Sequence, residues 1–493
     1  MTSSDSLILS SGDNLFGMLH APSALATRVA HSLCRAAHLC LLVFVLSGCS
    51  RPRPTPAPGP ASTCAIVAAA PTPPDTVSVA LAAPVVSTHA PSPVNSAERF
   101  VFAQMYETLV DVDCDGRAYP GLARSWAMDA TRTRLSLVIH DGARFWNGEA
   151  VRAPDVVAAW RATGEQSGES SRLARQLADA ATIVDDRTLI VSLPDTAWRV
   201  LADPALAVYR PQAGPAWPEG SGPYRVAERP GSTEPLTLAP VSAAAGPYVA
   251  IRSRPNADAR DAIDAAVDVL VTGDPVAMSY AATHSNLTAV PLPWRRTYAL
   301  GIASLGSNSA VPLVSLLRDI EPLEASLSRD AVHAEARPAE VQYWLANIQG
   351  CTSKDQHPDA ARGAGTQSNR IVYRRGDRAA QGIAERLVAL GRGLTAAGLA
   401  PGEFARSLHA GDNLAYVLQI PRLSLAPCRD LAVLESDAPW LAGGVREGIG
   451  SPEPTPLFPL IDTRDRAIVD RNHVSATIDW DGTLRLRGGP HRP

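Results

Sequence analysis

The chain has 493 residues, of which 46% are hydrophobic and 19% are charged, and its formal net charge is −4. This length and hydrophobic content can bury one large core or two medium ones. The slightly acidic balance, with Lys354 as the one lysine, gives no basic field for nucleic acid, so no nucleic-acid partner is expected.

Residues 1–48 have the pattern of a secretory signal. Arg35 precedes a short apolar run at 39–46, and small residues then lead to Cys49. The run is too short to span a bilayer. Leu-Ser-Gly-Cys at 46–49 resembles the bacterial lipobox, which implies that Cys49 becomes the lipidated first residue of the mature protein. A buried apolar helix with an incidental cysteine is the alternative.

Residues 49–74 are rich in proline and predict a disordered, extended tether of polyproline II character. A lipid anchor followed by such a tether suits a protein held at the outer face of a membrane. We therefore expect a place in the cell envelope, periplasmic or extracytoplasmic.

Alternation and helical spacing of apolar residues predict the elements that follow. They are a strand at 76–83, an amphipathic helix at 97–110 and a strand at 135–139. The dipeptides Asp141-Gly142 and Asn147-Gly148 are typical of tight turns, so 143–146 is predicted as a strand or a strand-like corner. Pro154 and Asp155 fit the first turn of the next helix.

The order of four motifs makes this region specific. They are YETL at 106–109, PGLARSW at 120–126, HDGARFWNGEAVRAPDV at 140–156 and SGPY at 221–224. Together they resemble the N-terminal signature of the extracellular solute-binding proteins of the peptide/nickel class (family 5), which are receptors of ABC importers. The resemblance implies an α/β, two-lobed fold of the periplasmic-binding-protein type II kind, with mixed sheets and helices on both faces.

The resemblance also implies the lobe boundaries. Lobe 1 takes 75–302, lobe 2 takes 303–452, and 453–493 return to lobe 1. Further lobe 1 elements are predicted as strands at 187–193 and 235–240, a helix end running into a buried strand at 262–273, and a crossing strand at 298–302.

Lobe 2 is predicted to alternate strands with helices. A helical stretch is expected at 326–341, strands at 371–373 and 414–420, and helices at 379–390 and 401–408. This alternation predicts a largely parallel sheet covered by helices. The tail is predicted as a strand at 457–462 and a hairpin at 475–486 that turns at Asp481-Gly482.

Cysteine spacing gives no sign of a metal site, because no CxxC pair and no zinc-like Cys/His spacing occurs. Asp111, Asp113 and Asp115 alternate like the start of a calcium loop, but Leu122 stands where a glutamate is required. A disulfide between Cys351 and Cys428 is compatible with an envelope protein, but the sequence does not establish it. We expect no metal and no cofactor.

Motifs of catalysis are missing too: the sequence has no GxSxG elbow, P-loop, HExxH or GxGxxG after a strand, so we expect no enzyme. The resemblance instead implies a monomeric lipoprotein that captures a peptide-like or other small polar solute by lobe closure and delivers it to a membrane permease with its ATPase. The alternative is a degenerate homologue that acts as a surface interaction or sensor module without transport.

Pockets of such receptors need flat aromatic walls. The predicted ligand-binding residues are Tyr106, Trp146, Tyr224, Tyr343, Trp344 and Tyr416. The competing interpretation is that aromatics in fold-defining motifs, such as Trp126 and Trp146, belong to the core.

Overall fold

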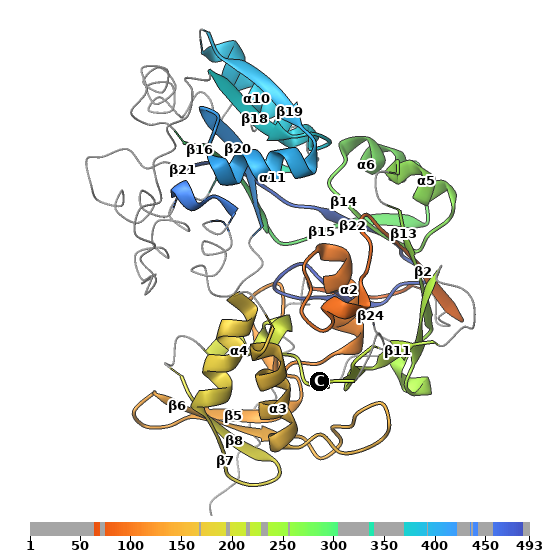
Figure 1. Ribbon diagram of the computed structural model, residues 1–493. Coiled ribbons are helices and arrows are strands. Elements are labelled where there is room, and N and C mark those ends of the chain that lie inside the picture. Colours follow the sequence, from red (N-terminus) through yellow and green to blue (C-terminus); the bar gives the residue numbers. More distant parts are fainter. Residues whose placement is uncertain are drawn as a thin grey trace, which may run out of the picture. The chain divides into compact units, whose positions relative to one another are not determined.

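The computed structural model describes residues 64–69, 74–166, 169–193, 198–212, 217–227, 235–254, 257–303, 335–339, 369–391, 393–421, 434, 437–441 and 457–486 (Figure 1). In this part of the chain no helix is both long and apolar enough to cross a membrane. The predicted signal, Cys49, Tyr343, Trp344, Cys351 and Cys428 lie outside the described residues.

The first lobe contains a seven-stranded sheet in the order β11-β12-β13-β2-β14-β22-β15. Its strands are β2 (Thr76–Leu81), β11 (Tyr224–Val226), β12 (Leu236–Pro240), β13 (Tyr248–Ser253), β14 (Val269–Thr272), β15 (Leu287–Pro291) and β22 (Arg466–Asp470). β2 runs parallel to β13 and β14, whereas β22 runs antiparallel to β14 and β15. The short helices α5 (Ala259–Asp264) and α6 (Pro275–Ala281) flank β14 in sequence.

A second sheet of this lobe has the order β5-β6-β8-β7 and is covered by two helices. Its elements are β5 (Ala123–Met128), β6 (Arg134–Ile139), β7 (Ala181–Ile183), β8 (Thr188–Ser192), α3 (Ala153–Gly164) and α4 (Glu169–Ala180). The two helices lie side by side (yellow in Figure 1). As predicted, Pro154 lies in the first turn of α3, where the Asp155 carboxylate accepts a hydrogen bond from the Arg152 amide.

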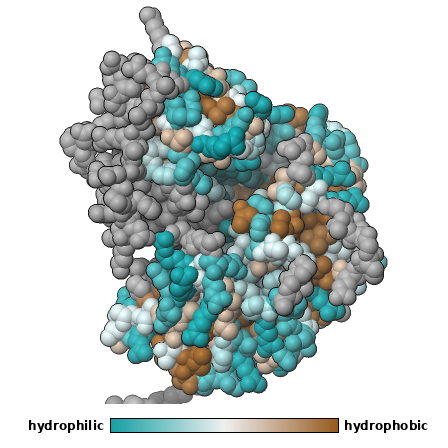
Figure 2. Space-filling view, viewed as in Figure 1, coloured by the Kyte–Doolittle hydropathy of each residue, from teal (hydrophilic) through white to brown (hydrophobic). Residues whose placement is uncertain are grey.

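Hydropathy follows this packing. The surface over α3 and α4 is mostly hydrophilic in the space-filling view, while a hydrophobic patch at the bottom of that view lies over β7 (Figure 2). Ile183 and Val184, at the end of this edge strand, are 44% and 56% exposed.

α2 (Ser96–Met105) ends five residues before the predicted helix limit. Asn95 caps its start by accepting a hydrogen bond from the Glu98 amide. At Tyr106 the backbone turns extended, and Val110 belongs to β3 (Val110–Val112), which pairs with β4 (Ala118–Pro120). The apolar spacing persists to Val110 because both the helix face and the strand are buried.

The predicted tether is wrong for residues 64–69. β1 (Ala65–Ile66) pairs with β23 (Ala476–Ile478), which forms the predicted hairpin with β24 (Leu484–Leu486). A disulfide joins Cys64 to Cys114. The β1–β23 pairing and the Cys64–Cys114 disulfide thus hold a segment that the proline content predicted to be a solvated, extended tether.

The second lobe contains a six-stranded sheet in the order β17-β21-β16-β20-β18-β19. Its elements are β16 (Arg296–Ile302), β17 (Ala336–Pro338), β18 (Arg370–Arg374), β19 (Thr395–Leu399), β20 (Ala415–Pro421), β21 (Leu457–Thr463), α10 (Arg378–Leu390) and α11 (Pro401–Ala410). The strand β17 lies within the predicted helical stretch 326–341, so the helix prediction is wrong there. β19 was not predicted.

This sheet has a hydrophobic core on each face. Along β16, Tyr298, Leu300 and Ile302 join the core under α10, while Ala299 joins the core under α11. Only β18, β19 and β20 are parallel, because β16 lies antiparallel between β20 and β21. The sheet is mixed rather than largely parallel.

Within the described residues, the chain crosses twice between the seven-stranded sheet and the six-stranded sheet. The first crossing lies between the end of β15 at Pro291 and the start of β16 at Arg296. The second lies between the end of β21 at Thr463 and the start of β22 at Arg466. Because β16 and β21 pair within the six-stranded sheet, the two crossings fall at 292–295 and 464–465. The expected lobe boundaries 302/303 and 452/453 are therefore wrong.

The remaining elements are short. They are β9 (Tyr209–Arg210), β10 (Glu219–Gly220), η1 (Ser87–His89), η2 (Trp198–Ala202), η3 (Pro204–Leu206), η4 (Ala243–Ala245) and η5 (Pro439–Leu441).

Candidate functional site

Two glycines of the SGPY region fix the aromatic residues beside α2. A Cβ on Gly222 would lie 2.5 Å from the Met105 carbonyl carbon, and one on Gly220 would lie 2.5 Å from the Trp146 ring. The Trp146 indole N–H donates to the Gly222 carbonyl over 3.1 Å. The ring centroids of Tyr106 and Trp146 are 5.8 Å apart.

Tyr106 is 3% exposed, and its hydroxyl donates to the Pro218 carbonyl over 3.1 Å. Burial, together with the nearby Tyr209, raises the pKa of Tyr106 above its usual range. The hydroxyl therefore stays protonated and acts as a hydrogen-bond donor. Tyr106 and Trp146 lie side by side, and their polar ends are occupied by backbone carbonyls.

Tyr224 and Tyr416 are both 0% exposed. The Tyr224 hydroxyl donates to the Ala245 carbonyl over 3.1 Å, and burial raises its pKa to about 12. The Tyr416 hydroxyl donates to the Ser407 carbonyl over 2.8 Å and accepts from the Asn413 amide over 3.0 Å. Neither ring offers a free face in this structure, so both act as core residues here.

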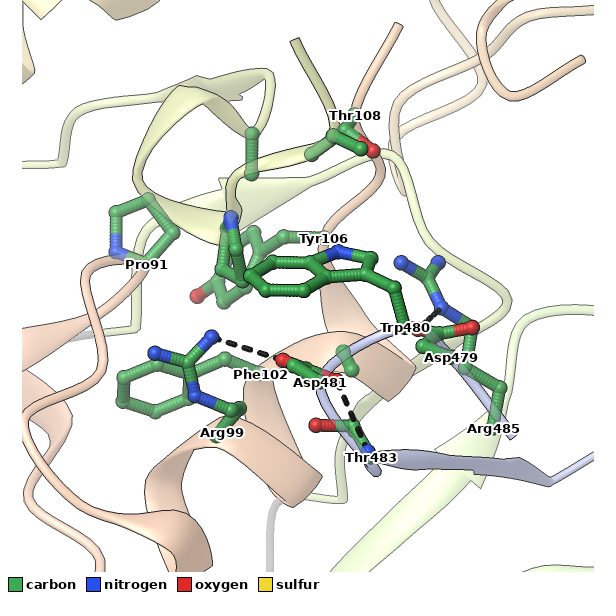
Figure 3. A pocket seen from close by; sticks show the side chains of 14 residues that line it. Pro91, Arg99, Phe102, Tyr106, Thr108, Asp479, Trp480, Asp481, Thr483 and Arg485 are labelled. Carbon is green, nitrogen blue, oxygen red and sulfur yellow. Dashed lines mark hydrogen bonds and ion pairs between the residues drawn. The ribbon is translucent and has the colours of Figure 1, made fainter. Parts of the chain in front are cut away.

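A small cavity lies in the first lobe, between α2 and the turn of the β23–β24 hairpin (Figure 3). Its volume is about 20 Å³, which accommodates one water molecule. Tyr106 is the predicted site residue that lines it. The other lining residues are Pro91, Arg99, Phe102, Ala103, Thr108, Ala202, Pro204, Ala207, Asp479, Trp480, Asp481, Thr483 and Arg485.

Two arginines that line this cavity, Arg99 and Arg485, make three ion pairs. Arg99 donates to Asp481 over 2.8 Å, and Arg485 pairs with Asp479 and, over 3.1 Å, with Asp111. Figure 3 shows Arg99 and Arg485 approaching the turn from opposite sides, with the Trp480 indole between them. Burial acts to raise the pKa of Asp481, but Arg99 and hydrogen bonds from Thr483 outweigh it, so that pKa is lowered.

The hairpin turn also meets the first crossing segment, 292–295. The Arg295 guanidinium lies 5.1 Å from the Trp480 ring centroid, and a Cβ on Gly482 would lie 3.6 Å from the Pro293 ring. The cavity therefore lies on the side of the first lobe from which the chain leaves for the second sheet.

The two crossing segments are joined to each other. Arg296 makes a bidentate ion pair with Asp465, at 3.1 and 2.8 Å. The guanidinium groups of Arg337 and Arg464 each lie 4.6 Å from the Trp294 ring centroid. Glu335 pairs with both Arg464 and Arg466. We call Trp294, Arg296, Arg337, Arg464 and Asp465 the crossing clasp.

Asp268, Asp470 and His473 place their ligand atoms within 4.8 Å of one another, which is the spacing of a metal site. Their oxygens are already occupied: Asp268 accepts from Ser78 and from His473, and Asp470 accepts from the Asn286 side chain and the Asn472 amide. The trio is therefore explained as a hydrogen-bond network between β14 and the end of β22.

The sequence analysis proposed Tyr106 and Trp146 as ligand contacts, and it did not single out the charged residues of the cavity and the clasp. The Asp-Trp-Asp-Gly turn at 479–482 was interpreted as a turn alone. Two carboxylates in a turn flanked by buried strands are a signal that could have been used, because buried charges require partners.

Two lobes joined by two crossing segments define the class of the protein: it has the two-lobed fold of the periplasmic binding proteins. A dipeptide-binding protein from Pseudoalteromonas sp. SM9913 has a TM-score of 0.61 at 12% identity, with 84% of this chain and 100% of that chain covered. The murein tripeptide-binding protein MppA of Escherichia coli gives 0.59 at 14%, covering 84% and 99%. NikA of Brucella suis, solved with Fe(III)-EDTA, gives 0.56 at 14%, covering 80% and 95%.

At this low sequence identity, the structural similarity shows the fold alone. In addition, residues 117–239 match the model of the bacterial extracellular solute-binding proteins, family 5 middle region. The matched range contains the motifs at 120–126, 140–156 and 221–224, so the resemblance predicted from them is confirmed. No curated protein sequence matches the chain.

Proposed function

We propose that this protein is the solute-binding component of an ABC importer, and that it captures a peptide-like or other small polar solute by closure of its two lobes. The observation that carries the proposal is the pair of crossing segments, 292–295 and 464–465, because two short connections allow two rigid sheets to move as bodies about one hinge. The family match supports the solute-binding role. MppA is a murein tripeptide-binding protein and the Pseudoalteromonas protein is a dipeptide-binding protein, and both have the same fold.

A place in the cell envelope has independent support from the disulfide between Cys64 and Cys114, since such bonds persist in oxidising compartments. The lipobox-like run ending at Cys49 adds a lipid anchor to the proposal. A membrane permease and its ATPase are the proposed partners that take over the solute, and the receptor acts as a monomer.

For ligand contact we propose Tyr106, which lines the cavity, with Trp146 behind it, and Tyr343 and Trp344 as predicted from the sequence. Tyr224 and Tyr416 are buried in the cores and are not proposed as ligand contacts. No catalytic step is proposed, because binding and closure are sufficient for delivery.

The test begins with native mass spectrometry of protein purified without refolding, to identify a retained solute. Small-angle scattering of the solute-free protein with and without that solute, or with a di- and tripeptide pool, should then show a smaller radius of gyration in its presence. Tyr343→Ala with Trp344→Ala should weaken binding, while Tyr248→Ala, exposed at 48% on β13, should not. An unchanged radius at saturating solute would refute closure.

One observation favours a second candidate, a degenerate homologue that acts as an interaction or sensor module. In the described part of the chain Tyr106, Tyr224 and Tyr416 are buried and Trp146 is half-buried, all with bonded polar ends, and the first-lobe cavity has room for one water molecule. This candidate predicts that no small solute is retained and that a protein partner binds without any change in the radius of gyration.

A further inference from the structure

We propose that Asp111, Asp479 and Asp481, together with Arg99 and Arg485, form a buried site in the first lobe that binds one proton in the folded state. Four separate pieces of the chain supply it: α2, β3, the β23–β24 turn and β24. The side chains of Asp479 and Asp481 are 7% and 3% exposed.

The charges of this site do not balance. Three carboxylates face two guanidinium groups: Arg99 serves Asp481, while Arg485 is shared between Asp479 and Asp111. A buried cluster with one unmatched negative charge is strongly unfavourable, and a proton on one carboxyl group restores neutrality.

Asp479 is the group that takes the proton. It shares its guanidinium partner, whereas Asp481 has Arg99 to itself and also accepts from the Thr483 amide over 2.9 Å. The Tyr119 hydroxyl lies 3.4 Å from an Asp479 oxygen. The pKa of Asp479 is raised to about 7: burial is the main cause, the carboxylates of Asp111 and Asp481 act in the same direction, and Arg485 opposes them.

Other charged groups near Asp479 are differently engaged. The backbone of Asp113 pairs with that of Asp479, but its carboxylate accepts from the Asp115 and Arg117 amides. Arg295 lies over the Trp480 ring next to Asp479 in sequence. The site thus holds the hairpin turn on α2 and against the first crossing segment.

The sign of the pH effect follows from the two states. In the unfolded chain Asp479 titrates near 3.8, so between about pH 4 and pH 7 the folded state binds a proton that the unfolded state does not. Stability contributed by this site is complete below that window and is lost as the pH rises through it. His473 acts in the same direction, because its hydrogen bond to Asp268 raises its pKa, and must be removed from the measurement.

The experiment uses the purified full chain carrying His473→Gln, with urea unfolding followed from pH 5 to pH 8. We expect the folding equilibrium constant to fall on the order of tenfold to a hundredfold over this range. Asp479→Asn should flatten the dependence, because the amide mimics the protonated acid. Asp111→Asn should flatten it too, since two carboxylates then match two guanidinium groups.

Asp113→Asn is the matched control and should leave the dependence intact, because its carboxylate contacts neither guanidinium group. The proposal is overturned if the dependence survives in Asp111→Asn, or if His473→Gln alone abolishes it. If Asp479→Asn does not fold, Asp111→Asn decides the question by itself.

Discussion

Glycine at 222 is a residue whose identity the fold dictates. Its amide donates to the Met105 carbonyl over 2.9 Å, and a Cβ there would lie 2.5–2.8 Å from backbone atoms of Met105 and Tyr106. Backbone cannot move aside as a flexible side chain does, so Gly222→Ala should lower the free energy of unfolding by about 2–3 kcal/mol. Urea denaturation with tryptophan fluorescence measures this loss.

Gly402 in α11 is the matched control. A Cβ there would meet only the end of the Arg406 side chain, at 3.7 Å, so Gly402→Ala should stabilise the protein by about 0.5–1 kcal/mol. Equal effects of the two substitutions would show that the close approach of Gly222 to α2 does not matter.

At the scale of elements, the bond between Cys64 and Cys114 fastens β1 to the turn between β3 and β4. The cysteines are 50 positions apart, and closing a loop of that length stabilises a fold by about 2–4 kcal/mol. Cys64→Ser with Cys114→Ser should therefore lower the urea midpoint, and reduction of the wild type by dithiothreitol should do the same. A reductant effect that persists in the double variant would assign it to other cysteines.

An element could be predicted when the residues that determine it lie within the element itself, and not when its partners are distant in the sequence. Strands β2, β6, β8 and β20 and helix α10 were predicted from their own apolar spacing, and α3 was predicted from Pro154 and Asp155 in its first turn. β19 was not predicted because it contains Gly398, and a glycine there is typical of a break between elements. In the structure Gly398 lies against the Tyr373 ring, where a Cβ would be 3.0 Å from the ring. β1 was not predicted because the groups that hold it are distant in the sequence: it pairs with β23 near residue 477, and the adjacent Cys64 bonds to Cys114.

The same distinction explains the site. Tyr106 and Trp146 belong to motifs read along the chain and do pack together. The pairing of Arg99 with Asp481 spans 382 positions, and that of Arg296 with Asp465 spans 169. No local pattern predicts such partners.

For the whole molecule, the crossing clasp is the part that any lobe movement must deform. Trp294→Ala removes the ring that Arg337 and Arg464 both approach at 4.6 Å. We expect amide hydrogen exchange at 292–296 and 463–466 to become about three to ten times faster, because a cation–π contact of this kind contributes about 0.6–1.4 kcal/mol. Peptides from β6 and β8 serve as internal controls, and unchanged exchange at the crossings would show that the clasp does not restrain them.

The chain enters the six-stranded sheet through β16 and leaves it through the neighbouring strand β21, since Arg296 of β16 stands opposite Thr463 of β21. Everything between these two positions is therefore a cassette whose ends are already adjacent. A cassette taken from a relative could be grafted onto this scaffold at 295 and 464 without rethreading the recipient. Evolution could use the same exchange, because the segment between 295 and 464 can be replaced as one block while the first lobe with its buried proton site stays unchanged.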